Sequence, residues 1–384
     1  MTPAARVAAA IEVLDRWLDG VPAEKALTGW ARGARYAGSK DRAAVRDHVY
    51  DVLRRKGACA ALGGVDGRGL MLGLLRLQGF DPATVFTGEG HAPVPLSDAE
   101  RQAPDASPDV WRDVPDWLHQ PLRESLGAGA PDIVGAMQTR APLYLRVNAR
   151  KASVNQAQER LLEDGIKTET CQAEMALKVT EGDRRLRQSS AYMDGSVEIQ
   201  DLSVQLACAA VDWPQRGKVL DYCAGGGGKA LAIAAVSDAH VFVHDANPSR
   251  MSDIPARAAR AGVILTTISR PDDREPYDLV LCDVPCSGSG TWRRDPEAKW
   301  RLTPERLAEL GQVQRQIVEQ AQTLVRPGGR LVYMTCSLLD AENQAVVDAA
   351  LSAPEWNMLT SSRFLPPEAS DGFFLAVMRR SGNG

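Results

Sequence analysis

The chain has 384 residues, 44% of them hydrophobic and 24% charged, with a formal net charge of −4 at pH 7. These values are typical of a globular protein with two or three domains and a large core. No run approaches the roughly 18 apolar residues of a membrane span, and the first residues lack the apolar core of a signal peptide. We therefore expect a cytoplasmic protein with no membrane partner.

The seven cysteines are odd in number and widely spread, with neither a C-x-x-C pair nor the Cys/His spacing of a zinc site. This usage favours reduced thiols over a disulfide framework, and we expect no metal. Four of these cysteines are interpreted as small buried hydrophobic residues: Cys59, Cys171, Cys208 and Cys282.

Residues 1–85 are predicted to form a small helical domain. A first helix would bury one apolar face with helical spacing, made of Val7, Ile11, Leu14, Trp17 and Leu18. A second helix would begin after Ser39 as N-cap and bury Val45, Val49, Val52 and Leu53. The first 60 residues carry eleven Lys or Arg against seven Asp or Glu, which allows contact with a phosphate backbone or simply a solvated surface.

The middle of the chain changes character twice. Residues 86–112 are rich in proline and acidic residues, which predicts a linker. Residues 113–195 are predicted to form a small α+β module, with a strand over 143–148 and a helix over 154–165 that ends at Gly165.

From residue 196 to 384, strands alternate with helices. This alternation predicts an α/β domain built on a parallel sheet with right-handed crossovers. The expected strands cover residues 219–222, 239–244, 277–282 and 330–334, and the expected helices cover 230–236 and 313–324.

A glycine loop, Gly225 to Gly228, lies between the first of these strands and its helix. Glycine lets a ligand approach the backbone closely, and the helix N-terminus beyond favours polar or negative ligand groups. Asp245 ends the next strand, where a carboxylate can bind both hydroxyls of a ribose. Since the spacing fits neither the dinucleotide fingerprint nor a P-loop, a nucleoside cofactor such as S-adenosylmethionine fits better, with a plain structural turn as the alternative.

Two cysteines, Cys286 and Cys336, each follow a predicted strand closely, so their thiols should meet where such sheets bind ligands. A thiolate that adds to C6 of a cytosine makes C5 able to attack an electrophilic methyl group, and a second cysteine could assist release. Asp283 is placed to stabilise charge at ring N3 and the exocyclic amine. The alternative is a pair of small buried hydrophobic residues.

The segment 291–301 follows the Cys286 loop and adds basic side chains with the indoles of Trp292 and Trp300. Indole stacking with cationic contacts suits an unstacked base on a single-stranded substrate. The alternative is a packing loop.

Taken together, these motifs resemble the RNA 5-cytosine methyltransferases of the RsmB/NOP2/Sun family, bacterial small-subunit rRNA type, over about residues 140–378. The resemblance is carried by residues 200–205, Asp221 to Lys229, Asp245 with Arg250, Asp283 to Gly290 with Arg294, Pro296 and Trp300, Pro327 to Gly329, and Thr335 to Ser337 with Glu342 and Asn343. Less specifically, residues 38–54 resemble the NusB-like RNA-binding domain that precedes the catalytic part in such enzymes.

The resemblance implies a Rossmann-like class I methyltransferase domain, S-adenosylmethionine as cofactor, and an RNA substrate, rRNA first, that the small module would help to recognise. It implies that Cys336 is the nucleophile, that Cys286 helps release the product, and that Asp283 contacts the base. The residues expected to contact the cofactor are Cys223, Ala224, Gly225, Gly226, Gly227, Gly228, Lys229, Asp245 and Asp283.

The chain departs from the family at the cofactor site. The family usually has Ala-Pro where this chain has Gly225-Gly226, so we expect a more flexible loop. The usual threonine after the loop lysine is Ala230, and Ser269 stands where an acidic residue near the adenine is common, which leaves the adenine contacts open.

Three alternatives remain beside a monomeric rRNA enzyme. A DNA cytosine-5 methyltransferase would use Cys286 as its nucleophile, but the second motif around Cys336 argues against it. A tRNA cytosine-5 methyltransferase would carry the same motifs. A non-catalytic RNA-binding ribosome-assembly factor could have kept the fold while losing cofactor binding.

Overall fold

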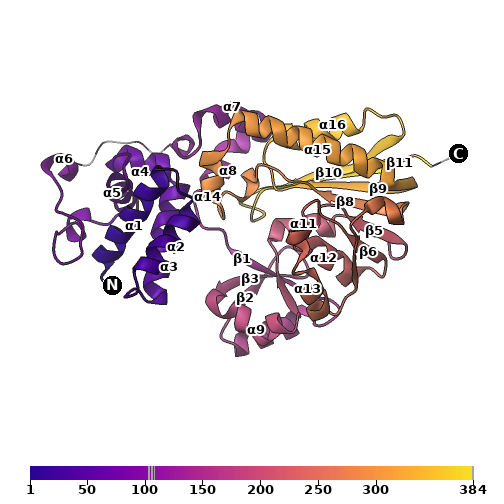
Figure 1. The fold of residues 1–384 in the computed structure, drawn as a ribbon, viewed down its shortest axis with the longest axis horizontal. Coiled ribbons are helices and arrows are strands. Elements are labelled where there is room, and N and C mark those ends of the chain that lie inside the picture. Colours follow the sequence, from indigo (N-terminus) through magenta and orange to yellow (C-terminus); the bar gives the residue numbers. More distant parts are fainter. Residues whose placement is uncertain (103, 105–106, 108, 383–384) are drawn as a thin grey trace. The chain divides into compact units, whose positions relative to one another are not determined.

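The computed structural model describes residues 1–102, 104, 107 and 109–382, and it divides into two compact units (Figure 1). The first unit comprises Met1–Arg123, Gly127–Arg140 and Trp292–Arg301, and the second comprises Glu124–Leu126, Ala141–Thr291 and Leu302–Gly384. These units differ from the predicted domain boundaries, because most of residues 113–140 and a ten-residue segment after the Cys286 loop fold with the N-terminal helices.

The first unit is helical. Its α-helices are α1 (Pro3–Leu18), α2 (Ala23–Gly33), α3 (Ser39–Arg54), α4 (Lys56–Gly63), α5 (Gly67–Leu77), α6 (Asp98–Arg101), most of α7 (His119–Leu126), α8 (Ala130–Ala136) and α14 (Pro296–Arg301). Short 3-10 turns are η1 (Pro82–Thr84), η2 (Val110–Asp113), η3 (Asp116–Leu118) and η4 (Gly127–Gly129).

The predicted apolar faces are confirmed with two corrections. The stripe of α3 is fully buried, as predicted for Val45, Val49, Val52 and Leu53. On α1, however, Ile11 is only partly buried and Leu18 is exposed, since it is the last residue of the helix. Ser39 is the first helical residue rather than the cap. Gly38 occupies the N-cap position, and its N–H donates to the Asp41 carboxylate at 3.3 Å.

The segment predicted as a linker is partly folded. Phe86 and Leu96 are buried in the core of the helical unit, so this stretch packs against the helices. Ser97 caps α6, and Glu100 of that helix pairs with Arg68 at 2.7 Å. Residues 103, 105, 106 and 108 of the proline-rich run lie outside the described residues.

In the second unit, a small antiparallel sheet has the strand order β2-β3-β1-β4. Its elements are β1 (Leu143–Val147), β2 (Lys167–Thr170), β3 (Ala176–Glu181), β4 (Val197–Ile199), α9 (Val154–Glu163), η5 (Asp183–Gln188) and α10 (Ser190–Met193). The predicted strand and helix are both confirmed. Gly165, just beyond α9, has a φ of +74°, which explains why glycine ends this helix.

A seven-stranded sheet forms the rest of the second unit, in the order β10-β11-β9-β8-β5-β6-β7. Its strands are β5 (Lys218–Asp221), β6 (His240–Val243), β7 (Leu265–Thr267), β8 (Tyr277–Asp283), β9 (Val325–Thr335), β10 (Trp356–Phe364) and β11 (Phe373–Arg380). The strands from β9 to β7 pair in parallel, which confirms the Rossmann-like prediction. The antiparallel pair β10 and β11 at the edge was not anticipated.

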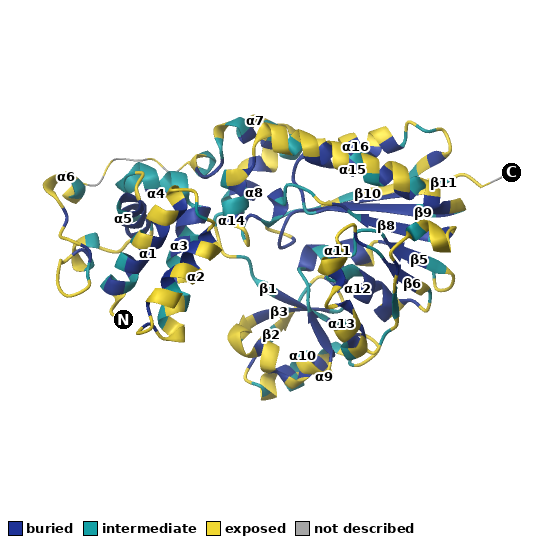
Figure 2. Cartoon of the chain, viewed as in Figure 1, coloured by how far each residue is buried: buried dark blue, intermediate teal, exposed yellow. Residues whose placement is uncertain are grey.

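Helices cover both faces of this sheet (Figure 1). One face carries α11 (Leu202–Ala209), α12 (Gly228–Val236) and α13 (Ile254–Ala261), the other α15 (Pro304–Leu324) and α16 (Gln344–Ala350). Successive strand residues pack to opposite faces, as Val219 and Leu220 do, so the central strands are mostly buried, whereas the edge strands β10 and β7 are largely exposed or partly buried (Figure 2). The turns η6 (Pro248–Met251), η7 (Pro271–Arg274), η8 (Ser289–Thr291) and η9 (Asp340–Glu342) complete the unit.

The strands β5, β6 and β7 follow one another toward one edge of the sheet, and β8 then lies on the other side of β5. The strand order therefore reverses between β5 and β8, and open α/β sheets bind their ligands at such a topological switch point. Within the described residues, no single helix is long and apolar enough to cross a membrane, and α4 with α5 satisfies that test only as a pair bent by 97°. The same part of the chain contains no group of three or more His, Cys, Asp or Glu side chains that could bind a metal ion.

Candidate active site

Two cysteine sulfur atoms meet at the carboxyl ends of neighbouring strands. Cys286 lies in the loop after β8, Cys336 directly follows β9, and the two strands pair in parallel. The two Sγ atoms are 3.3 Å apart, both thiols are free, and both residues are partly exposed. The predicted meeting of the two thiols is thus confirmed, while their separate roles remain predictions.

The surroundings of Cys286 favour its neutral thiol. Its hydrogen bond with Cys336, its burial and the nearby charge of Glu342 all raise the pKa of the Cys286 thiol well above its usual range. The Cys286 S–H can therefore donate to the Cys336 sulfur at neutral pH. A proton donor thus lies beside a second sulfur that can act as the nucleophile.

A buried carboxylate joins the two cysteine loops. Glu342, in η9, is fully buried. Its Oε1 accepts from the Ser287 backbone N–H at 2.8 Å and from Gln314 Nε2 at 3.0 Å. Its Oε2 accepts from the Ser287 and Ser337 hydroxyls, each at 2.5 Å. Because each serine directly follows one of the cysteines, a single side chain fixes both loops.

Gly290 brings two backbone segments together beside the same loops. Its N–H donates to the Cys336 carbonyl at 2.9 Å, and its own carbonyl accepts from the Gly372 N–H at 2.8 Å. A Cβ at position 290 would lie 2.1 Å from the Gly372 carbonyl oxygen. The close approach therefore requires glycine here.

Asp283 and Lys229 link the cysteine loops to the glycine loop. Lys229 Nζ lies 2.5 Å from Asp283 Oδ2 and 5.3 Å from the centre of the Phe373 ring. Burial disfavours the charged lysine, but the Asp283 carboxylate more than compensates, so that the pKa of Lys229 is raised. Lys229 thereby fixes the position of Asp283, the residue expected to contact the base, at the end of β8.

Two further carboxylates lie at the same edge of the sheet. Asp221 ends β5 and is almost fully buried, and its Oδ1 has no partner among the described residues. Burial raises the pKa of Asp221 to about 7, although Lys229 opposes the shift. Asp245, after β6, accepts from the Gly225 N–H at 2.9 Å and pairs with Arg250 at 3.2 Å. This acidic edge suits a cationic ligand that also carries hydroxyl groups.

The glycine loop turns sharply between β5 and α12. Gly225 and Gly227 have φ angles of +50° and +78°, which only glycine adopts easily. The Gly227 N–H donates to the Ala224 carbonyl at 2.8 Å, closing the turn. Burial raises the pKa of Cys223, so this residue remains a neutral thiol that contributes packing and backbone rather than nucleophilic chemistry.

Some sequence expectations need correction. The stacking interpretation of the two indoles is wrong for Trp292, which is only 2% exposed. Trp300 packs against the helical core of the first unit and donates its indole N–H to the Leu53 carbonyl at 2.7 Å, as a packing loop would. Cys171 is partly exposed instead of buried.

Two functional candidates were missed by the sequence reasoning. Glu342 belongs to the family motif, but no role was assigned to it, because its four hydrogen bonds come from three residues in different parts of the chain, Ser287, Gln314 and Ser337. Asp221 was part of the glycine-loop motif, and its place as the last residue of β5 is the signal that could have revealed it.

Two family models match this chain. The model for 16S rRNA methyltransferase RsmB/F matches residues 209–379, and the model for an RsmF/B-like ferredoxin-like domain matches residues 114–183. Ribosomal RNA small subunit methyltransferase B of Vibrio cholerae is 34% identical over 284 residues, which cover 69% of this chain. The chain spans 65% of that relative's length.

Solved structures share the fold. The crystal structure of PH0851 has a TM-score of 0.76 and 22% identity over 99% of both chains. The structure of NSun6 from Pyrococcus horikoshii with SFG has a TM-score of 0.63 and 17% identity, and the match covers 70% of this chain and 99% of that one. At these identities, the likeness shows the arrangement of elements that both matches share with this chain.

Proposed function

Because this chain belongs to the RsmB/F family of methyltransferases, we propose that it transfers a methyl group from S-adenosylmethionine to C5 of a cytosine in RNA, with 16S rRNA as the first candidate substrate. The observation that carries the proposal is the 3.3 Å approach of the Cys286 and Cys336 sulfur atoms at the ligand-binding edge of the sheet. Methyl transfer to a carbon as inert as cytosine C5 needs covalent activation, and two adjacent thiols suit that chemistry.

S-adenosylmethionine is the methyl donor of this family and supplies an electrophilic methyl group when bound. The acidic edge fits such a ligand, since the unpartnered oxygen of Asp221 suits a cationic group. Asp245 would bind the ribose hydroxyls. Backbone groups from Cys223 to Gly228, with Lys229 behind them, would surround the methionine portion.

The proposed chemistry begins at Cys336. Its thiolate forms a bond to C6 of a cytosine that takes up a proton at N3, while the Asp283 carboxylate accepts from the N3–H and from the exocyclic amine. The electron pair of the C5=C6 double bond then forms the new bond from C5 to the methyl carbon, and the thioether product leaves. A water molecule then takes the C5 proton, the C5=C6 double bond forms again, and the S–C6 bond breaks to regenerate the Cys336 thiolate; Cys286 assists this release.

Covalent trapping tests these roles directly. With an RNA that carries 5-fluorocytosine, methyl transfer leaves no proton at C5, so the S–C6 adduct persists. We expect Cys336→Ala to abolish the trapped complex. With ordinary RNA, Cys286→Ala should accumulate an adduct that the wild type releases. Cys171→Ala, a partly exposed thiol on the small sheet, is the matched control and should behave as wild type. Trapping lost only in Cys286→Ala would reverse the assignment and favour the DNA-type mechanism.

The substrate and the non-catalytic alternative need separate measurements. Calorimetry with S-adenosylmethionine distinguishes an enzyme from an assembly factor, because a pure scaffold would show no binding. Bisulfite sequencing of total RNA from a deletion strain identifies the modified cytosine. A lost signal in tRNA instead of 16S rRNA would favour the tRNA enzyme.

A further inference from the structure

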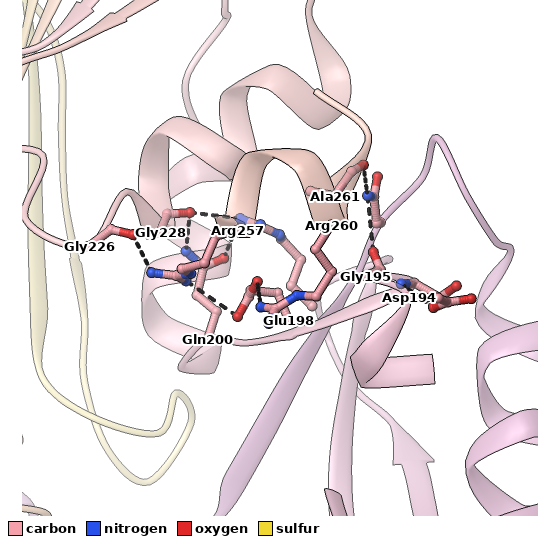
Figure 3. Close-up of polar contacts among 12 residues, drawn as sticks. Asp194, Gly195, Glu198, Gln200, Gly226, Gly228, Arg257, Arg260 and Ala261 are labelled. Atoms are coloured by element: carbon pink, nitrogen blue, oxygen red, sulfur yellow. Dashed lines mark hydrogen bonds and ion pairs between the residues drawn. The ribbon is translucent and has the colours of Figure 1, made fainter. Parts of the chain in front are cut away.

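An arginine of α13 contacts a backbone carbonyl of the glycine loop (Figure 3). Arg257 Nη1 donates to the Gly226 carbonyl, and its Nη2 lies 3.3 Å from Glu198 Oε1. The guanidinium is therefore placed between the loop and a carboxylate of the small sheet. Because its two terminal nitrogens contact two different acceptors, the planar guanidinium is fixed in both position and orientation.

Glu198 itself is well anchored. It lies on β4 and is only 8% exposed. Its second oxygen, Oε2, accepts from Arg260 Nη2 at 2.8 Å, so the carboxylate binds two arginines of the same helix (Figure 3). Of these two arginines, Arg257 also contacts the glycine loop. Arg260 instead lies over the ring of Tyr192, 4.5 Å from its centre.

A second contact from the small sheet reaches the next part of the loop. Arg146 lies on β1, directly opposite Glu198 of β4 in the strand register. Its Nη1 donates to the Gly228 carbonyl at 3.1 Å. Gln200 Nε2 lies 3.3 Å from the same carbonyl oxygen. Burial lowers the pKa of Arg146 to about 10, so this side chain is still charged at neutral pH. Two carbonyls of the loop are thus bound by side chains outside it.

The loop has a physical need for such restraint. Four consecutive glycines have more backbone freedom than any other four residues, and that freedom is lost when a ligand is bound by their amides. Groups that order the loop before the ligand arrives reduce this loss and so increase affinity. A charged side chain that donates to the loop carbonyls leaves the loop amides free for the ligand. It can therefore restrain the loop without blocking the site.

We propose that Arg257, oriented by Glu198, is a positioning residue that pre-orders the glycine loop for S-adenosylmethionine. This inference rests on the proposed function, since it concerns the affinity of that cofactor. The small sheet then has a task in the cofactor site in addition to any contact it makes with RNA. The guanidinium occupies the space beside Gly226, where a Cβ would lie 2.9 Å from Arg257 Nη1 and would push this side chain away from the loop.

Two readouts on the full-length chain test the proposal. Arg257→Ala should raise the Kd for S-adenosylmethionine about tenfold in calorimetry, the effect of one lost hydrogen bond to a charged group. In the ligand-free protein, the amides of residues 224–228 should exchange with solvent several-fold faster. Arg260→Ala is the matched control, because it breaks the other bond to Glu198 without touching the loop, and both readouts should stay within about twofold of wild type.

A rescue experiment separates loop positioning from general damage. Gly226→Pro restrains the loop covalently, because proline fixes its own φ and removes freedom from the chain. In the Arg257→Ala background, the space that the guanidinium left is open to the proline ring. The double variant should therefore recover most of the lost affinity and slow the exchange. Glu198→Gln, which keeps the shape of the side chain, should shift both readouts in the same direction as Arg257→Ala but less far.

The possible outcomes distinguish this inference from the proposed function. A wild-type chain that does not bind S-adenosylmethionine would refute the proposed function and, with it, the cofactor role of Arg257. If the wild type binds but Arg257→Ala has unchanged affinity and exchange, the positioning role alone is refuted. Equal losses in Arg257→Ala and Arg260→Ala, without rescue by Gly226→Pro, would show general destabilisation and would also overturn the proposal.

Discussion

The cysteine loops and the glycine loop lie at the same edge of one sheet but are held in opposite ways. The cysteine loops are joined from within by the buried carboxylate of Glu342, whose four hydrogen bonds fix two sulfur atoms against each other. The glycine loop is bound from outside, through its carbonyls, by Arg257 and Arg146. Covalent chemistry needs fixed reacting atoms, whereas a ligand-binding loop must keep its inner face open.

The largest effect should follow when the inner anchor of the cysteine loops is removed. Glu342→Ala leaves the Ser287 N–H and one of the two Gln314 amide N–H groups without an acceptor, in addition to an empty space; the other Gln314 N–H still donates to the Pro285 carbonyl. We expect the free energy of unfolding to fall by about 3–5 kcal/mol, since each unsatisfied buried donor costs about 1–3 kcal/mol. Denaturant unfolding measures this loss, and trapping of 5-fluorocytosine RNA should decrease with it.

Two comparison variants sharpen this prediction. Glu342→Gln should retain most of the stability, because the amide oxygen can still accept from both N–H donors while its NH2 group donates to the serine hydroxyls, which can rotate. Glu309→Ala removes an exposed carboxylate of α15 paired with Arg306 and should cost no more than about 0.5 kcal/mol. Equal losses in Glu342→Ala and Glu309→Ala would contradict the anchoring role.

The same contrast explains what the sequence could predict. Short continuous apolar runs are a local signal, and they placed β5, β6, β8 and β9 together with the sulfur-bearing loops that follow β8 and β9. The edge strands β10 and β11 were not anticipated, because antiparallel pairing at a sheet edge depends on long-range partners. Trp292 was misassigned for a similar reason, since only the fold shows that its indole is buried.

In the candidate site, the reacting groups were predictable from the sequence, and the residues that position them were not. Cys286, Cys336 and the glycine loop follow their strands in the sequence and could be placed from it. The anchors could not be placed, because Glu342 reaches the Cys286 loop and Arg257 reaches the glycine loop across tens of residues of the chain. Local sequence therefore predicts the reacting groups, and only the tertiary structure reveals what positions them.

Two glycine substitutions should separate the two kinds of loop. At Gly290, an alanine Cβ would lie 2.1 Å from the Gly372 backbone oxygen, so the cysteine loops must shift. Gly290→Ala is therefore expected to lower the free energy of unfolding by about 1–3 kcal/mol. At Gly226, the same methyl group would meet the end of the flexible Arg257 side chain, 2.9 Å away, which can move.

Gly226→Ala should accordingly change the free energy of unfolding by no more than about 0.5 kcal/mol while weakening S-adenosylmethionine binding, because Arg257 is displaced from the loop carbonyl. Parallel denaturant titrations and calorimetry measure both quantities. A stability loss at Gly226 as large as that at Gly290 would show that the two loops are equally rigid and would remove the contrast drawn between them.

The last expected effect, which changes no fold contact, is a pH dependence of cofactor affinity at Asp221, the buried carboxylate that ends β5. Because burial raises its pKa to about 7, Asp221 is protonated below that pH and becomes a carboxylate above it. Affinity for a cationic cofactor should therefore increase from pH 5.5 to pH 7, by at most tenfold or about 1.4 kcal/mol per pH unit. In this window the cofactor's own amino group remains protonated.

Asp221→Asn isolates this contribution from the other charged groups that face the site, Lys229, Asp245 and Asp283. The variant cannot ionise, so its affinity should be low and nearly independent of pH, whereas the wild-type curve should approach it at pH 5.5. Calorimetry in two buffers with different ionisation enthalpies adds a second measure, because binding near neutral pH should release protons from the wild type and none from this position in the variant. Parallel pH curves for both proteins would show that the unpartnered oxygen of Asp221 is not where the cationic ligand binds.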